Sequence, residues 1–137
     1  MIFKKLKIKK KTLLNKISVS SMCQYSANNG SPSKWHYNHL SSLMSSGAGS
    51  VMMESTAISK LGKITHKDLA IYSKKQTYDL KQLLIYLKKL NKQMPIGIQI
   101  SHSGRKGSAN LPWVKKGKSL SKSNNSWTTS APSSIKR

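Results

Sequence analysis

The sequence predicts an α/β fold with a parallel sheet. Three short segments, residues 17–19, 50–55 and 96–101, are apolar enough for strands, and the two longer segments between them carry apolar residues at helical spacing. Strands that alternate with helices are typical of right-handed βαβ units, in which each helix connects two parallel strands. Distinctive side chains also follow the C-terminal ends of these strands, which is where such folds build their ligand sites.

The N-terminal residues 1–14 predict a short β-hairpin. Phe3, Leu6 and Ile8 precede a lysine-rich turn, and two leucines follow it. The basic N-terminus is also compatible with a transit peptide, but it lacks the apolar core of a secretory signal. No run of sequence approaches the roughly 18 apolar residues that a membrane-spanning helix needs.

The first predicted strand leads into an unusual loop. Ile17 and Val19 alternate with serines, as in a strand with two different faces, and the pattern then breaks at Met22, Cys23 and Tyr25. A thioether, a thiol and a phenol at the end of a strand suit a flat aromatic ligand. The alternative, a buried apolar corner with a structural cysteine, stays open, since free Cys and Met are usually packing residues.

The first helix should begin near Lys34, after a cap at Ser33, and should end by Gly47. Its apolar face is formed by His36, Leu40, Leu43 and Met44. His36 and His39 are three residues apart, a spacing that two metal ligands can have, but no third ligand supports a metal site. We therefore expect no metal and assign both histidines to packing or to the surface.

The second strand, residues 50–55, contains one of the few acidic side chains. Glu54 lies near the end of this apolar stretch, and a buried carboxylate needs a cation or a polar site beside it. The small residues Ser55, Thr56 and Ala57 come next, so a ligand can approach the backbone closely there. A long connection then leads to the second helix.

The second helix and the third strand have clear sequence patterns. Ser73 and Gln76 have the spacing of a capping box, and leucines at positions 80–90 define an amphipathic helix that ends near Asn91. In the strand 96–101 the isoleucines should face the helices, while Gln99 faces the opposite side. A buried amide without a hydrogen-bond partner costs free energy, so we expect Gln99 to contact a ligand.

The charge of the chain is extreme. In 137 residues, 25 lysines and arginines face only 3 acidic residues, which gives a formal net charge of +22. Proteins that read nucleic acid usually rely on arginine, whereas this charge is almost all lysine, spread along the chain without interleaved aromatic residues. A non-enzymatic, lysine-rich protein that binds nucleic acid or another polyanion is therefore the alternative function. The single cysteine excludes an intrachain disulfide and fits a reducing compartment.

Several short sequences resemble the old yellow enzyme family of NAD(P)H:flavin oxidoreductases, which includes NADPH dehydrogenases. They are Leu-Asn-Lys-Ile at 14–17, Ser-Ser-Met-Cys-Gln-Tyr-Ser at 20–26, Trp-His-Tyr-Asn-His at 35–39, Glu-Ser-Thr-Ala at 54–57, Gly-Lys-Ile-Thr at 62–65, Asp-Leu at 68–69, Gln-Ile-Ser-His-Ser-Gly-Arg-Lys at 99–106, Pro-Trp at 112–113 and Ala-Pro-Ser at 131–133. The resemblance covers the whole chain in register, and Cys23 is typical of the bacterial subgroup often grouped with enoate reductases.

The resemblance implies a fold and an activity. Residues 1–137 would be the N-terminal portion of an FMN-binding (β/α)8 TIM barrel, with a hairpin at 1–14, the first three β/α units at 15–106 and a loop-rich tail at 107–137. The complete enzyme would be cytoplasmic, would take reducing equivalents from NAD(P)H through FMN and would reduce the activated C=C bond of a small α,β-unsaturated carbonyl compound. Because a TIM barrel takes about 250 residues, the barrel would be incomplete here, and the expected partners are a complementing downstream fragment or copies of the same chain.

The resemblance also implies residue roles. The flavin would be contacted by Ser20, Ser21, Met22, Cys23, Ala57 and Gln99. Tyr25 would face the substrate, and Cys23 would lie beside the reactive part of the flavin. The family's pair of substrate-binding histidines would lie beyond this chain, so no catalytic residue is predicted within it. Ser21 departs from the family pattern, which usually has proline at that position, and a serine loosens the loop.

Overall fold

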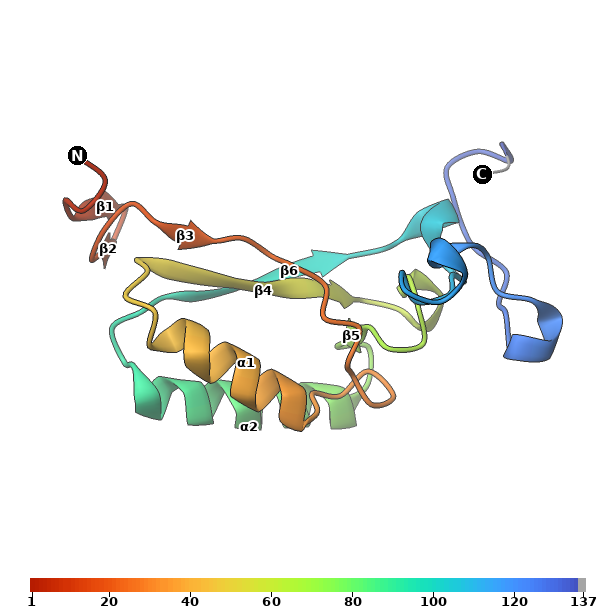
Figure 1. Cartoon of the computed structure of the whole chain (residues 1–137), viewed down its shortest axis with the longest axis horizontal. Helices are drawn as coiled ribbons and strands as arrows, with labels where there is room; N and C mark the ends of the chain where they lie inside the picture. Colours follow the sequence, from red (N-terminus) through yellow and green to blue (C-terminus); the bar gives the residue numbers. More distant parts are fainter. Residues whose placement is uncertain (136–137) are drawn as a thin grey trace.

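The structure, a computed structural model, describes residues 1–135 and consists of a parallel sheet with two helices on one of its faces (Figure 1). The strands are β1 (Leu6–Ile8), β2 (Lys11–Leu13), β3 (Ser18–Val19), β4 (Ser50–Ala57), β5 (Leu69–Ala70) and β6 (Ile96–Ser101), and the helices are α1 (Lys34–Met44) and α2 (Lys74–Leu90). Short 3-10 turns occur at Lys60–Gly62, Gly104–Lys106, Lys115–Gly117 and Lys122–Asn124. No helix within residues 1–135 is long and apolar enough to cross a membrane.

Strand β4 is the centre of the sheet. It pairs in parallel with β3 and β5 along one edge and with β6 along the other. The chain thus passes from β3 through α1 to β4, and from β4 through α2 to β6, which confirms the predicted parallel α/β arrangement. The sequence did not predict β5, which consists of only two residues in the connection before α2.

The N-terminal hairpin is confirmed as an antiparallel pair of strands. Strand β1 pairs with β2 in the register that places Leu6 opposite Leu13. The hairpin lies at the amino end of the sheet, and the tail after β6 lies at the opposite end (Figure 1). Both ends rise above the face of the sheet that the helices leave uncovered.

An irregularity in the central strand decides which residues face the helices. The register between β4 and β6 shifts between Met53 and Ser55, so Glu54 is an extra residue without a partner in β6. Met53 and Glu54 are therefore both buried on the helix side, although a regular strand would place them on opposite faces. Beyond the shift, Ser55 pairs with Gln99 on the uncovered face.

The core lies between the sheet and the helices. Its fully buried side chains include Leu83 and Leu87 of α2, Met44 of α1 and Met53 of β4. The capping box that begins α2 is confirmed, because the Ser73 hydroxyl accepts from the backbone N–H of Gln76 and the Gln76 side chain accepts from the backbone N–H of Ser73. This capping box fixes the start of α2, and the apolar layer holds both helices against one face of the sheet.

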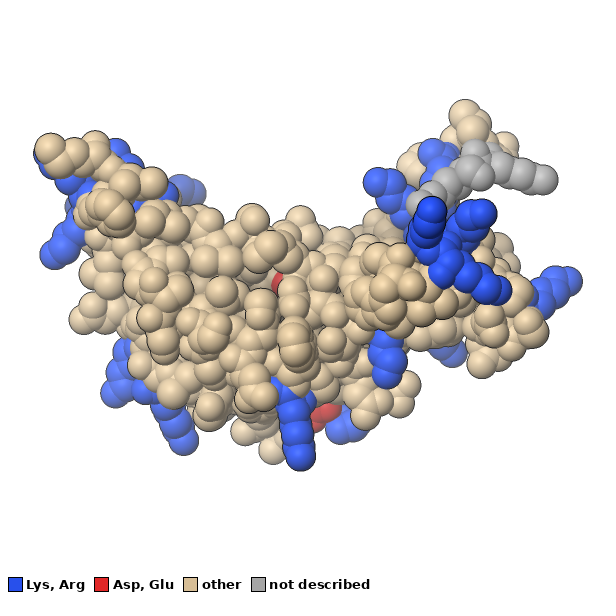
Figure 2. Space-filling view, in the orientation of Figure 1, with Lys and Arg blue, Asp and Glu red and all other residues tan. Residues whose placement is uncertain are grey.

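The opposite face of the sheet has no covering layer within residues 1–135. Register with β4 places small or polar residues on this face, namely Ser18, Ser50, Ser55, Gly97, Gln99 and Ser101, together with Met52. The space-filling view shows that the surface is hollowed between the two raised ends of the molecule (Figure 2). Lysines and arginines gather at these two ends. The expectation that the isoleucines of β6 pack under helices holds for Ile96 and Ile98, but it is wrong for Ile100, which is 63% exposed and is not part of the core cluster.

Candidate functional site

The centre of the candidate site is a buried carboxylate. Glu54 is 5% exposed, and one of its oxygens lies 3.0 Å from Nε2 of His36, which is 1% exposed. On the other side of the imidazole ring, Nδ1 accepts a hydrogen bond of 3.0 Å from the backbone N–H of Ser33. Because Nδ1 accepts, the proton of the neutral ring is on Nε2, so His36 donates to the Glu54 carboxylate.

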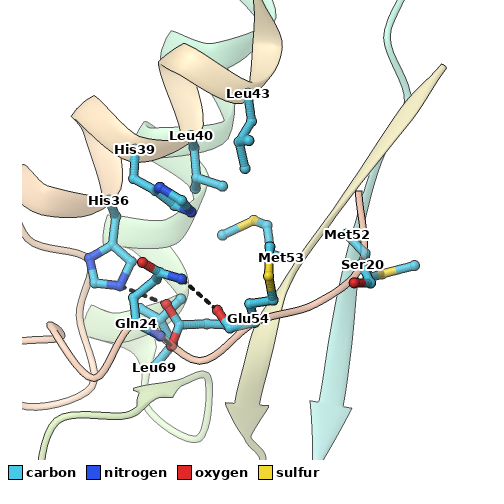
Figure 3. Close-up of a pocket in the computed structure, with 11 residues that line it drawn as sticks. Ser20, Gln24, His36, His39, Leu40, Leu43, Met52, Met53, Glu54 and Leu69 are labelled. Atoms are coloured by element: carbon cyan, nitrogen blue, oxygen red, sulfur yellow. Dashed lines mark hydrogen bonds and ion pairs between the residues drawn. The ribbon is translucent and has the colours of Figure 1, made fainter. Parts of the chain in front are cut away.

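The second oxygen of Glu54 holds the loop that follows β3. It accepts a hydrogen bond of 2.9 Å from the backbone N–H of Gln24, and this carboxylate lies between His36 and Gln24 (Figure 3). The Gln24 side chain fixes the same loop further, because it donates to the carbonyl of Met22 and accepts from the indole N–H of Trp35 in α1. The loop is thus attached both to the central strand and to the first helix.

This attachment supports an unusual backbone conformation at Tyr25. Its φ angle is 49°, in the left-handed region that bulky residues rarely adopt. The Tyr25 ring contacts Trp113 of the tail edge to face, with ring centroids 5.9 Å apart. Burial raises the pKa of the phenol to about 12, and the neighbouring Cys23 and Asp68 add to the shift. The hydroxyl is therefore protonated throughout the neutral range and is a hydrogen-bond donor.

Cys23 lies in the same loop and is half-buried. Burial raises the pKa of its thiol above the ordinary 9.0, and the carboxylates of Asp68 and Glu54 raise it further. A thiol in these surroundings is protonated at neutral pH and is a weak nucleophile. The arrangement therefore favours a neutral contact of Cys23 over nucleophilic chemistry.

The other predicted site residues lie at different depths. Ser20 and Met22 are exposed, and Ser21 is partly buried. Gln99 is exposed on the uncovered face, and its side chain forms no hydrogen bond with any residue that the structure describes. Ala57 is 2% exposed, so its side chain is packed within the protein.

A second buried carboxylate organises the loop beside the site. Asp68 accepts hydrogen bonds from the backbone N–H of Ile64 at 2.6 Å and from the Thr65 hydroxyl at 2.7 Å. Burial raises the pKa of the Asp68 carboxyl, while these hydrogen bonds oppose the rise. Lys67, the residue before Asp68, accepts through its carbonyl from the backbone N–H of Ala27, so the loop supports the end of the Tyr25 segment.

The two histidines of α1 have separate surroundings. His36 is held by Glu54 and Ser33, whereas His39 stacks on Trp35 with ring centroids 6.0 Å apart. Within residues 1–135, no group of three or more His, Cys, Asp or Glu side chains is close enough to hold a metal ion.

Comparison with known proteins identifies the family. The sequence model described as the NADH:flavin oxidoreductase / NADH oxidase family matches residues 1–131. The chain belongs to this family. It is 33% identical over 136 residues to an NADH:flavin oxidoreductase of Gibberella zeae, an alignment that covers 98% of this chain and 32% of the relative. It is 38% identical over 106 residues to an NADPH dehydrogenase of Clostridium acetobutylicum, which covers 77% of this chain and 31% of the relative.

Solved structures agree on the fold. The old yellow enzyme from Trypanosoma cruzi superposes with a TM-score of 0.73 at 21% identity, over 98% of this chain and 35% of that one. Morphinone reductase superposes with a TM-score of 0.69 at 18% identity, over 77% of this chain and 27% of that one. The resemblance to old yellow enzymes predicted from the sequence is therefore confirmed. The chain spans about a third of the length of the relatives that it matches.

The most strongly connected residue of the site was not among the predicted ones. Gln24 joins Glu54, Trp35 and Met22, but a single glutamine in a loop gives no sequence signal of its own. The sequence did indicate that Glu54 needs a partner and that His36 lies on the buried face of its helix. It did not connect them, because the contact spans 18 positions and depends on the irregularity in β4.

Removal of the central carboxylate should loosen the loop. Glu54→Ala leaves the His36 Nε2–H and the Gln24 N–H buried without an acceptor, which should lower the free energy of unfolding by about 2–4 kcal/mol. Glu54→Gln keeps one acceptor and should lower it less. Urea unfolding measures the loss, and amide hydrogen exchange at Gln24 should become faster in both variants.

A matched control is Asp79→Ala, because Asp79 forms an exposed ion pair with Lys75 on α2. This variant should leave the unfolding midpoint and the exchange at Gln24 almost unchanged. Equal losses for Glu54→Ala and Asp79→Ala would contradict the role given to Glu54.

The raised pKa of Cys23 predicts the pH dependence of its alkylation. In the folded chain, iodoacetamide should react slowly at neutral pH, and the rate should keep increasing above pH 9.0. The chain unfolded in urea should react faster at neutral pH, since its thiol has an ordinary pKa and full access to solvent. Mass spectrometry follows the modification, and fast alkylation of the folded chain at neutral pH would disprove a neutral, shielded thiol.

Proposed function

We propose that this chain provides the flavin-holding face of an FMN-dependent NAD(P)H oxidoreductase of the old yellow enzyme type. The observation that carries the proposal is the position of the loop 20–25 beside the C-terminal half of β4, next to the uncovered face of the sheet, where the Gln99 amide is exposed and has no hydrogen-bond partner among residues 1–135. In parallel α/β folds, ligands bind at this end of the strands. Membership of the NADH:flavin oxidoreductase / NADH oxidase family supports the same assignment.

The residues present fit a flat aromatic cofactor. The uncovered face carries small side chains near the ends of β4 and β6. Gly97 lies against the Met52 side chain, because a Cβ at position 97 would be 2.6 Å from the Met52 sulfur. Gln99 offers a donor and an acceptor that no described residue uses. FMN would be contacted by the loop residues Ser20, Ser21, Met22 and Cys23, by Gln99, and by the backbone at Ala57.

The chain's own residues have defined tasks in this proposal. Glu54 and His36 hold the loop at Gln24, so the loop is ordered before a ligand binds, which reduces the entropy lost on binding. Tyr25, whose phenol stays protonated, donates a hydrogen bond to the carbonyl oxygen of an α,β-unsaturated substrate. FMN, when bound, supplies the hydride chemistry between NAD(P)H and the activated C=C bond.

The chain alone should not be a competent enzyme. The uncovered face of the sheet supplies one side of the proposed site, and no described residue forms a layer across from it. The chain spans only 31% of the length of the Clostridium acetobutylicum relative. We propose that the remaining contacts to the flavin phosphate and to the substrate come from polypeptide that corresponds to the rest of the barrel. The single cysteine is consistent with work in the cytoplasm.

Flavin binding tests the proposal. Chain 1–137 alone should bind FMN weakly or not at all and should not oxidise NAD(P)H. Together with the part of the Clostridium acetobutylicum NADPH dehydrogenase that lies beyond the matched region, called the complementing part below, it should bind FMN and oxidise NADPH. Gln99→Leu in this mixture should weaken FMN binding by about 1–3 kcal/mol, because a buried donor and acceptor are lost.

Flavin fluorescence and NADPH absorbance are the measurements, with the complementing part alone as the background. The matched control is Gln82→Leu, a partly buried glutamine of α2 on the helix side of the sheet. Equal FMN affinity for Gln99→Leu and the unchanged chain would contradict the proposed site, as would tight FMN binding with turnover by the chain alone.

A further inference from the structure

Trp113, in the tail after β6, is a large ring beside the site that the proposed function does not use. Its indole lies edge to face against the Tyr25 ring, with the ring centroids 5.9 Å apart and the ring planes at 77°. The side chain is nevertheless 67% exposed, and its N–H forms no hydrogen bond with any of residues 1–135. The contact with Tyr25 thus covers only part of the indole and leaves the remainder open.

The segment that carries Trp113 is closed at its base. The backbone N–H and the side-chain amide of Asn110 both donate to the carbonyl of Lys118, at 2.8 and 2.9 Å, and the residues from 110 to 118 are called the Trp113 loop below. Next to this buried base, the backbone N–H of Ala109 donates to the carbonyl of Ile64 at 2.9 Å. The loop is therefore attached to the segment between β4 and β5.

The turn behind Trp113 is strained. Lys115 and Lys116 have φ angles of 48° and 50°, in the left-handed region, and Gly117 follows at 68°. Residues other than glycine adopt this region at a cost in free energy, and such outliers often occur at functional sites. Apolar burial does not offset the cost, because Trp113 and its neighbour Val114 are both exposed. The strained turn therefore favours a role for the exposed indole over a role in packing.

Trp127, the second tryptophan of the tail, has different surroundings. Its indole N–H donates to the carbonyl of Leu61 at 3.2 Å, and its ring centroid lies 5.0 Å from that of His66. Trp127 thus attaches the tail to the rest of the protein. Because the Trp113 loop is already held by Asn110, the Trp113 indole is not needed for attachment and can contact a ligand.

Tyr25 and Trp113 together suit a particular shape of substrate. In the proposed function the protonated Tyr25 phenol donates to a carbonyl oxygen. Aromatic rings attract each other in offset-stacked or edge-to-face arrangements, and the open indole provides a large surface for such a contact. A substrate that carries an aromatic ring near its carbonyl group can therefore contact both residues at once. An alkyl group in the same place has less surface to contact the indole.

We propose that Trp113 is a specificity-determining residue whose indole favours α,β-unsaturated carbonyl substrates that carry an aryl group. The inference rests on the proposed function, because it needs FMN on the uncovered face and the Tyr25 hydroxyl at the carbonyl oxygen. It adds the substrate class, since aryl enones are preferred over alkyl enones with the same reacting group. The nicotinamide ring of NAD(P)H is the competing flat partner of the indole.

The kinetic experiment compares 4-phenyl-3-buten-2-one with 3-penten-2-one, which carries a methyl group in place of the phenyl group. The protein is the mixture of chain 1–137, the complementing part and FMN, with NADPH as reductant. Trp113→Ala should lower kcat/KM for the phenyl enone at least about tenfold more than that for the methyl enone, chiefly through KM. Trp113→Phe keeps an aromatic ring and should retain most of the preference.

Two variants of the tail are the controls. Val114→Ala changes the exposed neighbour of Trp113, and Trp127→Phe changes the tryptophan that contacts His66. Both should keep the ratio of the two kcat/KM values within about twofold of that of the unchanged chain. Circular dichroism checks that every variant is folded.

A second measurement needs neither flavin nor turnover. The indole N–H signals of isotope-labelled tryptophan in chain 1–137 are followed by NMR, and Trp113→Phe assigns the Trp113 signal. Added 4-phenyl-3-buten-2-one should shift the Trp113 signal more than those of Trp35 and Trp127. Added 3-penten-2-one should shift the Trp113 signal less, because it has no aromatic ring to contact the indole.

The outcomes separate this inference from the proposed function. FMN binding and turnover with equal losses for both enones in Trp113→Ala, or with no loss for either, would overturn the inference alone. A raised KM for NADPH in place of the effect on the phenyl enone would assign the indole to the nicotinamide ring and overturn it too. Absence of FMN binding by the mixture contradicts the proposed function. The indole signals then decide whether Trp113 contacts an aryl enone, and equal shifts of all three would overturn that contact.

Discussion

The carboxylate of Glu54 accepts hydrogen bonds from His36 at the start of α1 and from the backbone of Gln24 in the loop after β3, while its own backbone belongs to the central strand. A buried carboxylate is stable only when such donors surround it, so strand, helix and loop must be assembled together for any of them to be well placed. The shift of register in β4 is what directs Glu54 to the helix side. Site and core therefore depend on the same local irregularity.

The sheet built around this interaction has two different faces. On one side, the leucines of α2, Met44 of α1 and Met53 of β4 belong to an apolar layer. On the other side, short polar side chains and the Gln99 amide remain uncovered. Hydrophobic burial therefore stabilises one face, whereas the second face and the outer edge of β6 have surfaces that only a ligand or further polypeptide can cover. The chain spans about a third of the length of its relatives, so the relatives contain further polypeptide of the kind that would cover these surfaces.

Local sequence signals predicted the helices and long strands well. The cap at Ser73, the leucines of α2 and the alternation in β6 each act over a few residues, and the structure places these elements as expected. Features that depend on distant contacts were harder to predict. Strand β5 exists only because Leu69 and Ala70 lie beside the end of β4, and Gln24 matters only because Glu54 reaches it. The family was recognisable because its short motifs are spread in register along the whole chain.

The position of the flavin on the uncovered face is the central claim, and the six methionines provide a direct test of it. Methyl-labelled methionines can be followed by NMR while FMN is added to the chain mixed with the complementing part. Met22 in the loop and Met52 on the uncovered face should show large ring-current shifts. Met44 and Met94, both buried on the helix side, should not shift. Bound flavin with unchanged Met22 and Met52 signals, or with shifts confined to Met44 and Met94, would contradict the account.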